Sequence, residues 1–245
     1  MARQETANTI INRTALEVGL STVTDPVADA DPAFKQLTGL LTAAGQELVE
    51  LHEWQVLRQE HEFTTVAATD TGIYTLPADF SYMINQSGWD QTNNVPIGGP
   101  LSSQGWSYVE GRGLTASTIY ASFRLAENKL EIYPQPPPDA LDIRFEYISR
   151  YWITQAGEAA PNADSVVIGS DVVLYEPILV IKFLKVKFLE AKGFDARAAR
   201  LEFETIFNSR TGKDEGGGIL SASGSSRGYP YLDPYRSVAD TNYGG

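Results

Sequence analysis

The sequence contains no cysteine and only two histidines, His52 and His61, among its 245 residues. The lack of cysteine excludes disulfide bonds, cysteine nucleophiles, thiolate zinc sites and iron–sulfur clusters. Two histidines are too few for a multi-histidine metal centre, and we expect each of them at the surface or at the end of an element. The sequence therefore predicts neither a metal ion nor any other cofactor.

Motifs for phosphate binding and for catalysis are also missing. Gly111-Arg112-Gly113 begins like a dinucleotide-binding fingerprint, but position 116 is Ala116 and no strand–turn–helix pattern surrounds the run. The only Gly-Lys pair, Gly212-Lys213, is followed by Asp214 and so forms no phosphate-binding loop. With 31 acidic residues, a pair of carboxylates suited to glycoside hydrolysis would arise by chance. We therefore expect a protein that is not an enzyme.

Positive charge and long apolar runs are scarce. The chain has 19 Lys and Arg against 31 Asp and Glu, which gives a formal net charge of −12. Proteins that wrap nucleic acid need an excess of basic residues, so this balance argues against nonspecific DNA binding. Glu176 and Lys182 interrupt the longest apolar stretch, which is too short for the roughly 18 residues of a membrane span. No apolar segment of the secretory type is found near the N-terminus, so we expect a soluble, non-secreted protein without a membrane partner.

Helical periodicity marks two N-terminal segments. Apolar residues recur at helical spacing over residues 5–19. Asp31-Pro32 then predicts the start of a second helix, whose apolar face continues to about residues 54–58. Gly39 and Gly45 would each cost about 1 kcal/mol inside this helix. Close helix packing would account for both.

Residues 61–153 are rich in Thr, Tyr, Phe, Ile, Gly and Pro, which is typical of antiparallel strands. Apolar and polar residues alternate over 141–149, as in a half-buried strand. Residues 126–128 are expected to form a hairpin loop, and the prolines of 134–138 a stiff turn between strands. A short helix is expected near 100–109. The expected strands are 61–66, 72–76, 87–91, 118–124, 129–133 and 141–149.

Helices are predicted again after Ser170. Asp171 or Glu176 could cap a helix whose apolar residues cover nearly every side, so this helix is central to the subunit or lies between subunits. Lys192-Gly193-Phe194-Asp195 predicts a tight turn into a second helix, which ends near Gly212.

The last 33 residues, 213–245, have a different composition. Glycine and serine dominate up to Gly228, and tyrosines follow. Tyrosine offers large contact area at low entropic cost and is enriched in interfaces. We interpret the segment as an extended docking arm with a reach of about 110 Å; the alternative is a disordered tail whose tyrosines are incidental. The expected contact residues are Ile219, Leu220, Tyr229, Tyr231, Leu232, Tyr235 and Tyr243.

These patterns predict an α+β fold with four parts. Residues 1–60 and 171–212 would supply the helices of an antiparallel helical bundle. Residues 61–170 would form a central antiparallel β-rich insertion, and residues 213–245 the C-terminal arm.

Four ordered stretches carry a resemblance to a known family. They read Leu76-Pro77-Ala78-Asp79-Phe80 with Gly88-Trp89-Asp90; Pro96 to Trp106; Lys129-Leu130-Glu131-Ile132-Tyr133-Pro134 with Phe145-Glu146-Tyr147-Ile148-Ser149-Arg150-Tyr151-Trp152; and Ala191-Lys192-Gly193-Phe194-Asp195 with Glu202-Phe203. As an ordered set, they resemble the head-to-tail adaptor family of short-tailed bacteriophages, also described as connectors, tail accessory factors or packaged-DNA stabilization proteins.

The resemblance implies a structural protein of the virion, assembled in the host cytoplasm and located at the head–tail junction. Such a protein forms a homo-oligomeric ring, commonly a dodecamer, beneath the portal protein. The ring extends the DNA channel, through which double-stranded DNA passes without specific binding, and gives tail nozzle or fibre proteins a platform. The C-terminal arm would then dock on the portal. Two other functions stay open: a phage-associated peptidoglycan hydrolase and a carbohydrate-binding β module.

Overall fold

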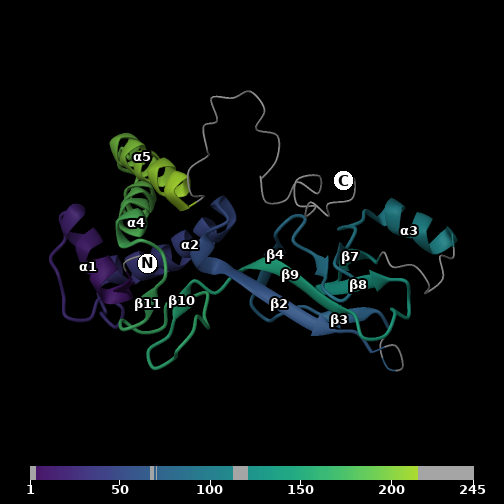
Figure 1. Ribbon diagram of the computed structural model, residues 1–245. Helices are drawn as coiled ribbons and strands as arrows, with labels where there is room; N and C mark the ends of the chain where they lie inside the picture. Colours follow the sequence, from purple (N-terminus) through teal and green to yellow (C-terminus); the bar gives the residue numbers. More distant parts are fainter. Residues whose placement is uncertain (1–3, 67–68, 70, 113–120, 215–245) are drawn as a thin grey trace, which may run out of the picture.

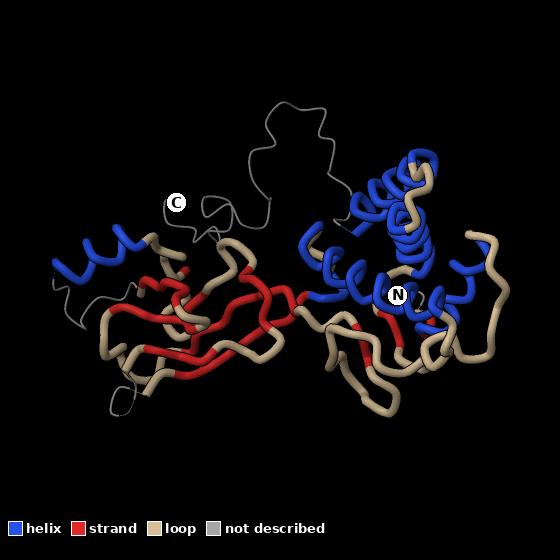
Figure 2. Tube along the Cα trace, turned by 180° about the vertical axis from the view of Figure 1, so that it is seen from behind, coloured by secondary structure: helices blue, strands red, loops and turns tan. Residues whose placement is uncertain are grey.

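The computed structural model describes residues 4–66, 69, 71–112 and 121–214. Its fold mixes helices with antiparallel sheets, which confirms the predicted α+β class. The elements form an elongated molecule with two ends (Figure 1). Four of the helices and a small sheet form a helical body at one end, and the larger sheets with one helix form a β body at the other (Figure 2).

Five α-helices are present in the described residues: α1 (Ala7–Glu17), α2 (Pro32–Leu51), α3 (Ser103–Arg112), α4 (Pro177–Ala191) and α5 (Arg197–Asp214). A short 3-10 turn, Gln55–Leu57, follows α2. The predicted start of α2 is confirmed, because the Asp31 carboxylate accepts a hydrogen bond from the Ala33 amide at 2.7 Å and Pro32 begins the helix. The predicted end of this helix is wrong, since α2 stops at Leu51.

The strands of the helical body are β1 (Glu5–Thr6), β10 (Ile153–Thr154) and β11 (Val172–Val173), which pair in the order β1-β11-β10. Residues 5 and 6 therefore belong to a strand, and α1 begins two residues later than predicted, with Thr6 as its N-cap. The strands of the β body are β2 (Arg58–Thr64), β3 (Ile73–Thr75), β4 (Phe80–Met83), β5 (Trp89–Asp90), β6 (Val95–Pro96), β7 (Ser122–Ala126), β8 (Lys129–Tyr133) and β9 (Asp142–Ser149).

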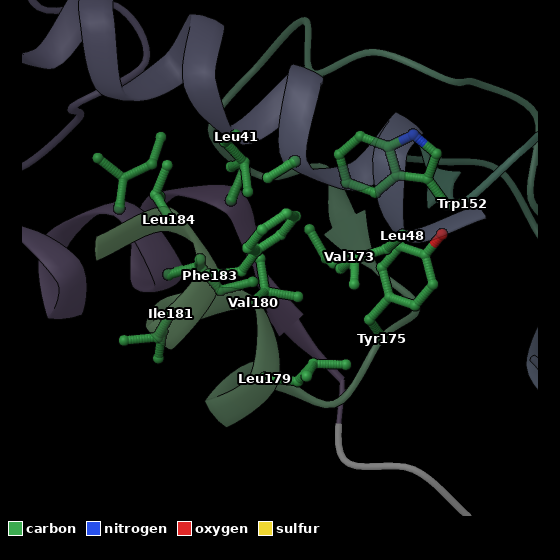
Figure 3. Close-up of a cluster of buried hydrophobic side chains, with 14 of the residues drawn as sticks. Leu41, Leu48, Trp152, Val173, Tyr175, Leu179, Val180, Ile181, Phe183 and Leu184 are labelled. Carbon is green, nitrogen blue, oxygen red and sulfur yellow. The ribbon is translucent and has the colours of Figure 1, made fainter. Parts of the chain in front are cut away.

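Helix α4 lies at the centre of the helical body, as its all-round apolar sequence predicts (Figure 3). Most of its side chains are buried, and residues of α1, α2 and α5 pack around it. Trp152 and Tyr175 stack on each other, with ring centroids 5.9 Å apart, and both belong to the buried core beside α2. Gly45 of α2 lies directly against the Trp152 indole, so a close contact exists there, but its partner is a loop tryptophan and not the second helix that was predicted. Gly39, by contrast, faces open space.

Two antiparallel sheets face each other in the β body. The larger has the order β2-β9-β5-β6, with β4 also paired to β9, and the smaller has the order β3-β8-β7. Phe123, Leu130 and Ile132 of the smaller sheet share one buried cluster with Ile143 and Phe145 of β9. The predicted hairpin loop between β7 and β8 is confirmed, because Glu127 and Asn128 both have positive φ, as a two-residue type I′ turn requires.

Strand β9 connects the two bodies. The alternation predicted for it is confirmed, since Leu141, Ile143, Phe145 and Tyr147 are buried in the β body. Ile148 lies on the other side of the strand from these residues and is buried in the core of the helical body. The strand thus changes its packing partner along its length.

Candidate interaction surfaces

The α4–α5 hairpin projects from the helical body. Gly193, at φ +73°, allows the chain to turn after α4, and the Asp195 carboxylate accepts a hydrogen bond from the Arg197 amide at 2.9 Å. Both features were predicted from the sequence. Helix α5 then buries only Ala199 and Phe203, the latter stacked on Phe183 of α4 at 4.4 Å. Most of α5 is therefore left exposed on this single chain.

A cluster of ion pairs lies beside α5. Lys182 of α4 contacts the carboxylates of Glu17 at 2.8 Å and Glu202 at 3.4 Å, and Lys185 contacts both at 3.3 and 3.4 Å. Partial burial opposes protonation, yet hydrogen bonds and charge from Glu17 and Glu202 raise the pKa of Lys182. The hydrogen bond and charge of Lys182 likewise lower the pKa of Glu202. Two lysines and two carboxylates therefore share the cluster, so their formal charges cancel.

Next to these ion pairs lies a hollow of about 400 Å³, here called the hairpin hollow. It is lined by Lys182, Ala198, Leu201, Glu202, Thr205 and Ile206. Leu201 is 62% exposed although it is a large aliphatic residue in the middle of a helix. A charge-neutral surface with an exposed leucine is suited to contact with an apolar group of another chain.

A second exposed apolar feature is the turn before β11, here called the aliphatic turn and formed by Val167 and Ile168. Their side chains are 60% and 47% exposed. The fully buried Asp171 carboxylate accepts hydrogen bonds from the amides of Val167 at 2.8 Å, Ile168 at 2.9 Å and Ala156 at 3.3 Å. Asp171 therefore holds this turn in place and does not cap α4. Glu176 precedes α4 without a capping hydrogen bond from its side chain.

The end of α5 is fastened at the boundary between the two bodies. The Asp214 carboxylate accepts a hydrogen bond from the Gln55 amide at 2.8 Å and lies 3.3 Å from Nε2 of His52. Together with Glu53 and Arg58, these residues line a polar pocket of about 120 Å³. This contact fixes the point at which residues 215–245 begin. The seven arm residues predicted to contact a partner, Ile219 to Tyr243, lie outside the described residues.

The two histidines occupy different settings. His52 is the C-cap residue of α2, as expected for a histidine at the end of an element. His61 lies within β2 against the ring of Phe145, with centroids 5.4 Å apart. Burial lowers the pKa of His61, and the nearby Asp79 carboxylate opposes this effect. Among the residues that the structure describes, no three His, Cys, Asp or Glu side chains are grouped as metal ligands.

The sequence did not identify the hairpin hollow or the aliphatic turn. Leu201 could have indicated the hairpin hollow, because this apolar residue lies outside the apolar face of α5 formed by Ala199, Phe203 and Ile206, which packs on α4. Val167 and Ile168 gave no signal, because their exposure depends on where the turn sits against α1, whose Asn8 amide donates a hydrogen bond to the Gly169 carbonyl at 3.0 Å. Within the described part of the chain, no helix is long and apolar enough to span a membrane.

Comparison with protein families assigns the chain. The model of the SU10 adaptor protein family matches residues 6–225, which include both bodies and every helix described above. The chain belongs to the SU10 adaptor protein family. Comparison with curated proteins yields no match. SU10 adaptors are structural proteins of bacteriophages and not enzymes, so the predicted kinship with phage head-to-tail adaptors is confirmed. The match favours neither the peptidoglycan hydrolase nor the carbohydrate-binding module.

Proposed function

We propose that this SU10 adaptor protein forms a ring beneath the portal of a phage head. The ring extends the DNA channel and provides the platform on which tail nozzle or fibre proteins assemble. The family match over residues 6–225 is the observation that carries this proposal. A dodecamer is the copy number that we propose.

The shape of the subunit supports a ring. The molecule is elongated and its two ends differ, with helices at one end and sheets at the other (Figures 1 and 2). Asymmetric subunits that contact each other head to tail form a closed ring when the rotation between them closes. A net charge of −12 on each copy makes the assembled channel repel DNA, which favours passage over binding.

Residues 213–245 act in this proposal as the arm that docks on the portal. The contact of Asp214 with Gln55 supports it, because it holds the last residue of α5 at a defined point beside the end of α2. Ile219, Leu220 and the tyrosines of the arm supply the apolar contact area. We propose that residues 1–60 with 171–212 supply most of the helical part of the ring subunit and residues 61–170 its β-rich part, with two exceptions. Strand β10 and the segment up to β11 pack in the helical body, and β2 begins at Arg58. We further propose that the free protein is monomeric and assembles only on a portal.

Deletion of residues 216–245 tests the arm. The truncated protein keeps Asp214 and every described helix and strand, so it is expected to fold normally by circular dichroism. It is expected to lose co-sedimentation with portal rings by at least tenfold. Tyr108→Ala, which removes an exposed tyrosine of α3 in the β body, is the control and should leave co-sedimentation unchanged. Portal binding by the truncated protein at the level of the full chain would refute the role of the arm, and stable rings of the isolated protein in light scattering would refute assembly on a template.

A further inference from the structure

We propose that Asp79 is the positioning residue that fixes the angle between the helical body and the β body. It fastens residues 79–84, here called the brace, to β9 at the place where the two bodies meet. The subunit therefore enters an assembly as one rigid unit. The rigid joint is a property of the single chain, whereas its use in a ring rests on the proposed function.

The brace packs into both hydrophobic cores at once. Phe80 and Met83 belong to the core of the β body, whereas Tyr82 and Ile84 pack against the core of the helical body. Neighbouring residues of one short segment are thus anchored in different bodies. A change in the angle between the bodies would pull one of these pairs out of its core, which costs the free energy of their apolar burial.

Strand β9 is divided between the cores in the same way. Tyr147 lies in the core of the β body, and the next residue, Ile148, lies in the core of the helical body. At these two residues β9 pairs with β2 on one side and with β4 on the other. The three strands lie where the two bodies meet (Figure 1). A two-stranded ribbon twists more than a wider sheet and is only marginally stable alone, so β4 stiffens the crossing.

Asp79 fastens the start of the brace to β9 by two contacts. Its carbonyl accepts a hydrogen bond from the Arg150 amide at 2.7 Å, and its carboxylate accepts one from the Tyr147 hydroxyl at 3.0 Å. A bond to an ionised carboxylate is stronger than one between neutral groups. Burial and the charge of Asp79 raise the pKa of Tyr147, so its hydroxyl keeps the proton that it donates. Asp79 thus binds both a core residue of the β body and the main chain that leads to Trp152 of the helical core.

Distances between spin labels on the two bodies test the joint in the free protein. The natural chain has no cysteine, so Lys35→Cys in α2 and Lys129→Cys in β8, both at exposed positions, provide the only attachment sites. Double electron–electron resonance should give one narrow distance distribution. Tyr147→Phe keeps the ring but removes the donor, and Asp79→Ala removes the acceptor, so each should widen the distribution. In both variants the Arg150 amide should exchange with deuterium about tenfold faster.

A matched control removes a bond of the same kind at the far end of β9. The Thr64 hydroxyl donates a hydrogen bond to the Asp142 carboxylate at 2.6 Å, within the β body. Asp142→Ala should therefore leave the distance distribution unchanged. Asp79→Asn keeps a side-chain oxygen that accepts the Tyr147 hydroxyl, so it should retain the narrow distribution. Circular dichroism verifies the fold of each variant, and Tyr147→Phe carries the test if Asp79→Ala does not fold.

The outcomes separate the joint from the ring. A narrow distribution in folded Tyr147→Phe would overturn the role of Asp79, and so would equal widening by Asp142→Ala. A wide distribution in the labelled protein with Asp79 and Tyr147 intact would overturn the rigid joint. Because the measurement uses the free chain, it decides the joint whether or not rings form. Electron microscopy that finds no ring of the unmodified protein on portals would refute the ring function alone.

Discussion

Replacing Gly45 by alanine measures how tightly α2 packs against Trp152. A Cβ atom added at Gly45 would lie 2.2 Å from Cζ2 and 2.3 Å from Cε2 of the Trp152 indole. Trp152 is fully buried and stacked on Tyr175, and its Nε1 donates a hydrogen bond to the Asp164 carbonyl at 3.0 Å. The rigid ring therefore cannot move aside without disturbing these contacts.

Gly39, on the exposed side of the same helix, provides the matched control. No atom lies within 4 Å of a Cβ added at Gly39, so Gly39→Ala should gain about 1 kcal/mol from helix propensity alone. Gly45→Ala gains the same propensity but adds overpacking strain of about 1–3 kcal/mol. The difference between the two variants removes the propensity contribution and isolates the contact with Trp152.

Urea unfolding followed by circular dichroism gives both free energies. We expect Gly39→Ala to raise the free energy of unfolding by about 1 kcal/mol, and Gly45→Ala to lie about 2 kcal/mol below it. Trp152→Phe removes the ring atoms that clash, so Gly45→Ala should cost less in that background. Equal free energies for Gly39→Ala and Gly45→Ala would refute the close approach of α2 to Trp152.

Two further predictions concern His61 and Asp171. Because burial lowers the pKa of His61, the unfolded chain binds a proton more readily, so the free energy of unfolding should fall as the pH drops below about 6.5. Between pH 7.5 and 5.5, the free energy of unfolding measured with urea should decrease less for His61→Phe than for the unmodified protein. Equal decreases in the two proteins would contradict this prediction. Asp171→Asn can keep one oxygen for the amides of Val167 and Ile168, but its NH2 group then opposes the Ala156 amide, so the free energy of unfolding should fall by about 2 kcal/mol. Asp25→Asn, at an exposed turn, is the control and should lower the free energy of unfolding by less than about 1 kcal/mol. Equal decreases for Asp25→Asn and Asp171→Asn would contradict the role of Asp171.

Features set by neighbouring residues were predictable from the sequence. The Asp31 cap, the Gly193 turn and the alternation along β9 each depend on a few consecutive side chains. The central position of α4 was also predictable, since a helix that is apolar on every side must be covered on every side.

Features set by distant contacts were not predictable. Gly39 and Gly45 look alike in the sequence, and only the position of Trp152, about a hundred residues later, distinguishes them. Asp171 has the sequence context of a helix cap, yet its carboxylate accepts a hydrogen bond from the amide of Ala156, fifteen residues earlier. Strand β4 was not among the expected strands, and what defines it is its pairing with β9, more than sixty residues later in the chain. The hairpin hollow and the aliphatic turn likewise depend on how the helices pack, which the sequence pattern does not specify.

Phage particles made without this protein test its role in assembly most directly. Electron microscopy of a phage whose gene for the chain is disrupted would count heads that hold DNA and heads that bear tails. The ring proposal predicts heads that lose their packaged genome and carry no tail. Heads that stay full and acquire complete tails would contradict it.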